Sequence, residues 1–233
     1  MKLAIVTINY NGSDKTIKLL KSLREQTNSD FQTIVVDNAS EGADFDNLKL
    51  NMGTMSYDMV PMLVRNNENL GFSGGNNVGI KKALENGAEW LVLLNNDTWV
   101  EKKFIASLKA ILATKQGIVG LPLDEGSQTA YYGKVQWLKP TLKHLHMLNT
   151  ECLTYAIGGG VAIHRDVFEK IGFWDEKYFL YFEDADFSLR AQKAGIPVTI
   201  APDVMIYHNS SSSTKKLGSP LLLRYHYRNA LYF

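Results

Sequence analysis

Short apolar runs alternate with helix-compatible segments through the first half of this 233-residue chain, and this alternation constrains the fold most. Apolar runs of four to eight residues bounded by polar ones predict buried strands. The predicted strands cover residues 3–8, 31–36, 60–64, 90–94 and 118–121, and the predicted helices cover 15–26, 73–85 and 102–114. This βαβα order predicts an α/β chain with a doubly wound, mostly parallel sheet.

The second half is less regular and predicts a smaller mixed region. Its predicted strands are residues 129–137, 155–164 and 197–201, and its predicted helices are 166–171 and 183–194. Gly158-Gly159-Gly160 interrupts one strand, either as a bulge or to let a ligand approach the backbone closely. Residues 138–151 have no clear pattern and predict a loop, and residues 210–213 predict a flexible loop that could close over a ligand.

Composition excludes several classes of protein. The net charge is +1 and no dense basic stripe occurs, so nucleic acid is not an expected partner. Cys152 is the single cysteine, which rules out an internal disulfide and fits a reducing compartment. No apolar run reaches the ~18 residues of a membrane span, and the start has no signal-peptide pattern. We therefore expect a cytoplasmic protein, with a location at the inner face of the membrane left open.

Polar side chains follow the predicted strands at their carboxyl ends. They are Thr7 and Asn9, then Asp37-Asn38, then Asn95-Asn96-Asp97. In a parallel sheet these ends share the edge where ligands bind. Their oxygen atoms suit a hard cation such as Mg²⁺ or Mn²⁺. The alternative is a polar turn, with Asp97 or Thr98 capping the following helix.

Two further segments could contact a nucleotide. Asp37 could accept an N–H from a pyrimidine ring, or it could be a turn residue. Residues 69–77 (Asn-Leu-Gly-Phe-Ser-Gly-Gly-Asn-Asn) lead into a helix whose amino end would favour an anion. They are not the dinucleotide fingerprint, because G-x-G-x-x-G would have to follow the first strand directly.

Acidic residues open the predicted helix 183–194. Glu183 and Asp184 lie about 100° apart around a helix, so only one can point squarely into a cleft. A carboxylate placed there could act as a general base, or the pair could simply complement the helix dipole. Asp186 and Arg190 are four residues apart and predict a surface ion pair. His208 follows another apolar run and could be structural or, near a metal, a ligand.

Taken together, the motifs resemble the inverting family 2 glycosyltransferases, especially rhamnosyltransferase-like members. The resemblance rests on seven motifs in order: Thr-Ile-Asn-Tyr-Asn at the start, Val-Asp37-Asn-Ala-Ser, residues 69–77, Leu-Asn-Asn-Asp97, Gly-Gly-Gly-Val-Ala-Ile, Phe-Glu-Asp-Ala-Asp186 and Tyr-His208. It covers nearly the whole chain. It implies a GT-A fold and an enzyme that transfers a sugar from a nucleotide diphosphate sugar, with inversion, in polysaccharide or glycan synthesis.

The resemblance also implies roles for particular residues. Asp97 would coordinate a divalent metal, Mn²⁺ or Mg²⁺, with His208 completing the site. Asp184 or Glu183 would supply the catalytic base, usually the second member of the pair. With the strand-end argument, the predicted donor-binding residues are Thr7, Asn9, Asp37, Asn38, Asn69, Gly71, Asn76, Asn77, Asn95 and Asn96.

Two positions depart from the family pattern. Asn95 replaces the first aspartate of D-x-D, and Asn76 stands where the family often has arginine. Among other classes, a nucleotidyltransferase would need an arginine-bearing loop after the first strand, and a dehydrogenase would need its fingerprint. A catalytically inactive sugar- or nucleotide-binding module is compatible with the same residues.

The expected organisation is a nucleotide-sugar-binding half (1–122), an acceptor and catalytic half (123–219), and the start of a truncated C-terminal helical segment (220–233). The expected partners are a UDP- or dTDP-linked donor and a saccharide or lipid-linked acceptor. Apolar residues surround Arg224 and Arg228 in the last segment. We expect this helix to pack on the catalytic domain, with at most peripheral membrane contact as the alternative.

Overall fold

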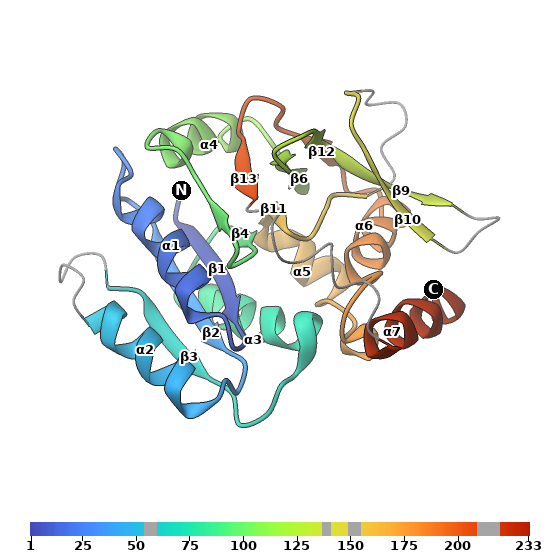
Figure 1. The fold of residues 1–233 in the computed structure, drawn as a ribbon. Helices are drawn as coiled ribbons and strands as arrows, with labels where there is room; N and C mark the ends of the chain where they lie inside the picture. Colours follow the sequence, from blue (N-terminus) through green and yellow to red (C-terminus); the bar gives the residue numbers. More distant parts are fainter. Residues whose placement is uncertain (54–59, 137–140, 149–154, 209–219) are drawn as a thin grey trace.

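A computed structural model describes residues 1–53, 60–136, 141–148, 155–208 and 220–233 of the chain. A twisted sheet runs through the molecule with helices on both of its faces (Figure 1). The predicted loop at residues 210–213 lies outside the described residues, as do Cys152 and residues 138–140 and 149–151 of the predicted loop 138–151.

The main sheet has seven strands in the order β12-β6-β11-β4-β1-β2-β3. Neighbouring strands are parallel except β11, which is antiparallel to β4 and to β6. The strands are β1 (Leu3–Asn9), β2 (Gln32–Asp37), β3 (Met62–Arg65), β4 (Trp90–Leu94), β6 (Ile118–Gly120), β11 (Gly160–His164) and β12 (Val198–Ile200). The α/β, mostly parallel fold predicted from the alternation is confirmed.

Alternate side chains of the strands enter two apolar cores. In β1, Leu3 and Ile5 face one core and Ala4 and Val6 face the other. The first core includes side chains of α1 (Ser13–Arg24), α2 (Gly42–Gly53) and α4 (Phe104–Leu112). The second includes side chains of α3 (Gly71–Glu85), α5 (Arg165–Ile171) and α6 (Glu183–Lys193). Burial on both faces explains why the strands read as continuous apolar runs.

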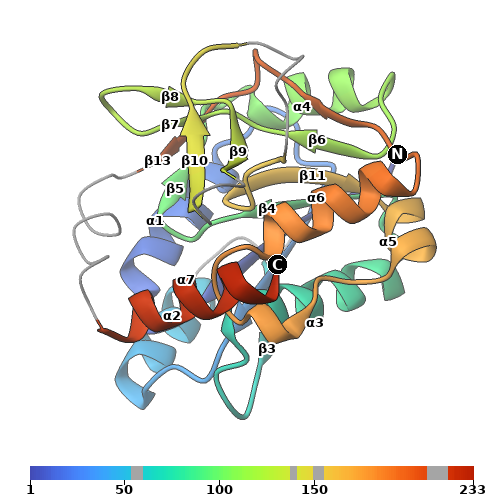
Figure 2. The same cartoon turned by 90° about the vertical axis from the view of Figure 1, so that its right-hand side faces the viewer.

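Two small sheets and two further helical elements complete the described structure. One sheet has the order β5-β13-β7-β8 and the other pairs β9 with β10. Their strands are β5 (Thr98–Trp99), β7 (Leu123–Asp124), β8 (Thr129–Ala130), β9 (Tyr132–Gln136), β10 (Thr141–Leu145) and β13 (Ile206–His208). The 3₁₀ turn η3 (Glu176–Tyr178) precedes α6, and α7 (Pro220–Tyr232) lies beside the segment that leads into α6 (Figures 1 and 2).

Three local expectations were wrong. Part of the predicted loop 138–151 is the strand β10, whose residues are all at least partly exposed, so no apolar pattern marks it. Thr98 does not cap the helix after β4, because it opens β5 and α4 begins later at Phe104. The helix predicted over residues 15–26 is two residues out of place, because α1 begins at Ser13 and ends at Arg24. The N–H of Ser13 donates to Asp44 of α2 at 2.9 Å.

The predicted Asp186–Arg190 pair is confirmed, with Nε and Oδ2 2.7 Å apart. Arg190 also donates to the carbonyl oxygens of Ile171 and Phe173, so it ties the end of α5 to α6. None of the helices in the described residues is both long and apolar enough to cross a membrane. The division of the chain at residues 122 and 219 stays a prediction.

Candidate active site

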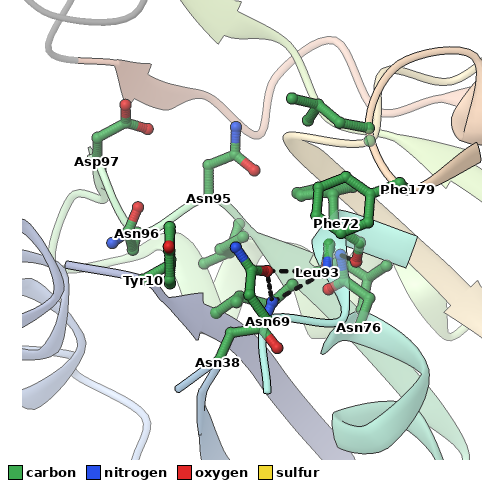
Figure 3. A pocket seen from close by; sticks show the side chains of 15 residues that line it. Tyr10, Asn38, Asn69, Phe72, Asn76, Leu93, Asn95, Asn96, Asp97 and Phe179 are labelled. Carbon is green, nitrogen blue, oxygen red and sulfur yellow. Dashed lines mark hydrogen bonds between the residues drawn. The ribbon is translucent and has the colours of Figure 1, made fainter. Parts of the chain in front are cut away.

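A pocket of about 270 Å³ opens at the carboxyl ends of β1 and β4. The Asn95-Asn96-Asp97 turn lies on one side and the rings of Phe72 and Phe179 lie on the other (Figure 3). The predicted residues that line it are Asn38, Asn69, Gly71, Asn76, Asn95, Asn96 and Asp97. The pocket is therefore rich in amides, with apolar walls and one carboxylate.

Asp97 and His208 come together although they are far apart in the sequence. The antiparallel pairing of β5 with β13 places His208 opposite Thr98, the residue after Asp97. As a result, Nε2 of His208 lies 3.2 Å from Oδ1 of Asp97. The Asp97 carboxylate raises the pKa of His208 above its usual range, against the effect of burial. Nζ of Lys15 lies 4.0 Å from the other carboxylate oxygen.

The donor atoms of this pair fit a divalent cation. A carboxylate oxygen and an imidazole nitrogen suit Mn²⁺ somewhat better than Mg²⁺. No cluster of three or more histidine, cysteine or acidic side chains that could hold a metal occurs within the described ranges. A cation here would therefore take further ligands from donor phosphates and water, as cations bound with nucleotides commonly do.

The two acidic residues at the start of α6, Glu183 and Asp184, differ in burial and in their contacts. Glu183 is 5% exposed, and its Oε2 has no hydrogen-bond partner among the described residues. Asp184 is half-buried and accepts the N–H of Gly158, a pocket residue, at 3.0 Å. Asp184 thus contacts a residue of the pocket wall, and Glu183 is buried.

Both carboxyl groups are held in a medium that disfavours charge. Burial raises the pKa of Glu183 well above its usual range, and the adjacent Asp184 acts in the same direction. Burial also raises the pKa of Asp184, but the N–H groups of Gly158 and Ala185 oppose this by stabilising the carboxylate. Asp184 is therefore the member that ionises more easily, and Glu183 keeps its proton to higher pH.

The pH dependence of folding should report this burial. Where the pKa of Glu183 is raised, the folded chain holds a proton that the unfolded chain has released, so the free energy of unfolding falls as pH rises above about 4.5. Glu183→Gln removes this titration. We expect the stability of Glu183→Gln relative to wild type to increase with pH, measured by urea unfolding at several pH values. The exposed Glu68→Gln is the control, and a pH-independent difference for Glu183→Gln would contradict the prediction.

Thr7, Asn9, Asp37 and Asn77 do not line the pocket, and each is at most 1% exposed. The Asn77 side chain donates to the Trp174 carbonyl oxygen and to Glu176, and accepts the Trp174 N–H. The Asp37 carboxylate accepts bonds from Asn9 and from the N–H of Ser40 and lies near Arg65. In this structure these side chains support the pocket from behind, and donor contacts from Asp37 stay a prediction.

Asn9 is the centre of the supporting network. Its amide nitrogen donates to Asp37, Ser40 and Asp44 over 2.8–3.0 Å, and its oxygen accepts from Thr16 at 2.8 Å. Asn96 of the pocket donates to the same Thr16 hydroxyl at 3.0 Å. The network therefore connects β1, α1 and α2 to the Asn95-Asn96-Asp97 turn.

Replacing Asn9 should destabilise the fold strongly. Asn9→Ala leaves buried carboxylate and hydroxyl groups without their donor, which should cost about 2–3 kcal/mol of unfolding free energy. Urea unfolding measures this loss. Asn28→Ala, which removes one local turn hydrogen bond at the surface, is the control and should cost far less. Equal losses for the two variants would show that the network contributes little.

The glycines before β11 make room for the protein's own side chains. A Cβ on Gly158 would lie 3.0 Å from the Trp174 ring and 3.2 Å from Cβ of Asp184. A Cβ on Gly159 would lie 2.9 Å from Nδ2 of Asn95. The close approach expected at these glycines is thus made, in this structure, by Asn95, Trp174 and Asp184.

Several pocket residues were not predicted. Tyr10 and Phe72 lie inside the motifs at residues 7–11 and 69–77, so these motifs could have indicated them as pocket residues. Phe179 and Leu180 belong to an irregular segment between η3 and α6. No periodicity or motif in the sequence marks them.

The fold is the GT-A fold of glycosyltransferases. The mannosyltransferase PcManGT from Pyrobaculum calidifontis, solved in complex with GDP-Man and Mn²⁺, has this fold with a TM-score of 0.67 at 17% identity, over 99% of this chain and 64% of its own. The S. aureus TarS 1-349 complex with UDP gives a TM-score of 0.63 at 18% identity, over 89% of this chain and 60% of its own. The chain thus spans less than two thirds of these two structures.

Sequence comparison defines the family. The family model described as "Glycosyl transferase family 2" matches residues 4–172, and the chain belongs to this family. The dTDP-rhamnosyl transferase RfbF of Shigella flexneri is 26% identical over 97% of this chain and 77% of its own length. The low-salt glycan biosynthesis hexosyltransferase Agl10 of Haloferax volcanii is 26% identical over 97% of this chain and 73% of its own.

Proposed function

We propose that this chain transfers a hexose or a 6-deoxyhexose such as rhamnose from a UDP- or dTDP-linked donor to an acceptor hydroxyl, with inversion at the anomeric carbon. The acceptor is a saccharide or a lipid-linked saccharide in the synthesis of a polysaccharide or glycan. The proposal places the enzyme in the cytoplasm with at most peripheral membrane contact. The rhamnosyl- and hexosyltransferase relatives support the choice of sugar.

One observation supports this proposal: the predicted metal and base residues either line one pocket or contact a residue that lines it. Asp97 lines the pocket and contacts His208, while Asp184 is bonded to Gly158 of the pocket wall. A reaction that separates a sugar from a diphosphate needs stabilisation of the leaving group and a base for the attacking hydroxyl. Asp97 with His208 would serve the first function, and Asp184, bonded to Gly158 of the pocket wall, would serve the second.

In the proposed reaction, Asp97 and His208 would hold a divalent cation, whose positive charge would offset the charge that develops on the diphosphate. The pocket amides of Asn38, Asn69 and Asn95 orient the donor. Asp184 accepts the proton of the acceptor hydroxyl, whose oxygen attacks the anomeric carbon on the face opposite the departing diphosphate. Glu183 remains protonated behind Asp184, so the pair does not carry two adjacent charges.

A screen of nucleotide sugars tests this function. Wild-type enzyme is incubated with UDP- and dTDP-linked hexoses and 6-deoxyhexoses in Mn²⁺ or in EDTA, and the released nucleoside diphosphate is quantified by chromatography. We expect slow, metal-dependent release from a subset of the donors without acceptor. Tight donor binding with no release, even with simple saccharide acceptors present, would favour an inactive binding module instead.

A further inference from the structure

We propose that Asn229 on α7 is a positioning residue for the active site. It holds the segment 178–182 in the conformation that places Phe179 in the pocket wall and Asp184 beside Gly158. This inference rests on the proposed function for its catalytic part. Its structural part can be tested without any activity.

Asn229 is a buried polar residue whose side-chain amide donates hydrogen bonds to three backbone carbonyl oxygens. It is 0% exposed, although α7 lies on the surface of the molecule. Its Nδ2 donates to the carbonyl oxygens of Tyr178, Leu180 and Tyr181 over 2.7, 2.7 and 2.8 Å. The adjacent Arg228 donates to the carbonyl oxygens of Lys177 and Tyr178. The end of α7 thus supplies hydrogen-bond donors that the backbone carbonyl oxygens of the segment need.

The segment needs such support because its backbone is strained. Phe179 has φ 60° and ψ −54°, and the N–H of Leu180 donates to the carbonyl of Tyr178 at 2.6 Å. This is a γ-turn of the rare, strained kind. Tyr181 and Phe182 also have positive φ, 72° and 74°. Bulky residues in such conformations are strained and persist only where the surroundings fix them.

The strained segment forms one wall of the active site. Phe179 and Leu180 line the pocket, and the carbonyl of Phe179 accepts the N–H of Phe72, whose ring lies on the same side of the pocket (Figure 3). A Cβ on Gly71 would lie 2.5 Å from this carbonyl oxygen, so α3 and the segment are in close contact. Phe182 is the N-cap of α6, and Glu183 and Asp184 follow it. A shift of the segment would therefore move both the pocket wall and the proposed base.

Aromatic rings of α7 pack on the same segment. Tyr225 stacks on Phe179 with ring centroids 4.8 Å apart, and His226 and Phe233 lie 5.3 and 5.6 Å from Phe182. These contacts could dock α7 without Asn229, so α7 docking and segment positioning need separate measurements. Asn229 differs from the rings because it acts on the backbone of the strained residues and not on their side chains.

The test uses Asn229→Leu, which is similar in size but has no donor, and Leu231→Ala as the control on the same helix. Leu231 is 88% exposed, so its replacement should change nothing. Hydrogen exchange across residues 176–187 reports the segment, and exchange in β1 and β4 reports the fold. We expect faster exchange only in the segment for Asn229→Leu. We also expect kcat to fall by about 10²-fold, the effect of displacing a catalytic group by about 1 Å.

Wild-type exchange in the segment of a folded Asn229→Leu would overturn the proposal, as would wild-type kcat. If Asn229→Leu does not fold, the exposed Arg228→Met decides, because it removes the donors to Lys177 and Tyr178 and leaves the core intact. It should show the same two effects to a smaller degree, and no change in either would overturn the proposal. Failure of the proposed function is distinguishable, since wild type itself would then release no nucleoside diphosphate while the exchange result stands.

Discussion

Replacing Asp184 by asparagine is expected to lower kcat by about 10²–10⁴-fold, the usual contribution of a general base. The side chain keeps its shape, and its oxygen can still accept the N–H of Gly158. It can no longer take a proton from an acceptor hydroxyl. Donor affinity should change little, because Asp184 touches the pocket wall and does not itself line the cavity.

Glu183→Gln is the matched control for this prediction. Glu183 is buried behind Asp184, and a glutamine there imitates the protonated acid, so much of the activity should remain. Steady-state kinetics with a donor found in the screen measures both variants. If Glu183→Gln is inactive and Asp184→Asn is active, the base is Glu183 and our reading of the pair is wrong.

Asp97→Ala is expected to abolish the effect of metal on donor binding. Removing the carboxylate leaves His208 alone, and the affinity for the nucleoside diphosphate in Mn²⁺ should fall at least about tenfold, as when metal-site residues are lost. Calorimetry with UDP or dTDP, in Mn²⁺ and in EDTA, measures this. Asp203→Ala removes an exposed aspartate near β13 and should behave as wild type.

Two calorimetric results would contradict the metal assignment. In one, Mn²⁺ does not raise the affinity of wild type above its value in EDTA. In the other, Asp97→Ala retains wild-type affinity in Mn²⁺. In the expected result, wild type and Asp97→Ala differ clearly in Mn²⁺ and much less in EDTA.

Much of the central sheet could be predicted from the sequence because its strands are buried on both faces. Each of the strands β1, β2, β4 and β6 is an apolar run, and the helices between them leave little choice of topology. The helix α2 was not predicted, because only Leu48 and Met52 are buried along it. The exposed strand β10 was predicted as a loop for a similar reason.

The candidate site was only partly predictable. The strand-end argument brought Asn38 and the Asn95-Asn96-Asp97 turn to one pocket, because parallel strands end at one edge. It could not tell which polar side chains at that edge point inward, so it also selected the buried Thr7 and Asn9. Strand alternation decides this orientation, and one residue of register changes the answer.

Contacts between segments that are distant in the sequence could not be predicted from local sequence patterns. His208 meets Asp97 through the very short pairing of β5 with β13, and strands of two or three residues have no periodicity to detect. The γ-turn at Phe179 places positive φ on a bulky residue, which disfavours it. The carbonyl that follows it, that of Leu180, is bonded to Asn229 of α7, 49 residues later in the chain. Such strained segments are stabilised by tertiary contacts and not by their own sequence.

The central claim is that Asp184 activates an acceptor oxygen that attacks opposite the diphosphate held near Asp97 and His208. The most direct test follows the anomeric configuration of the sugar at early times by proton NMR, with Mg²⁺ and a donor found in the screen. We expect a first product of configuration opposite to that of the donor, formed by wild type and at least about 10²-fold more slowly by Asp184→Asn. A first product with the configuration of the donor retained would contradict it.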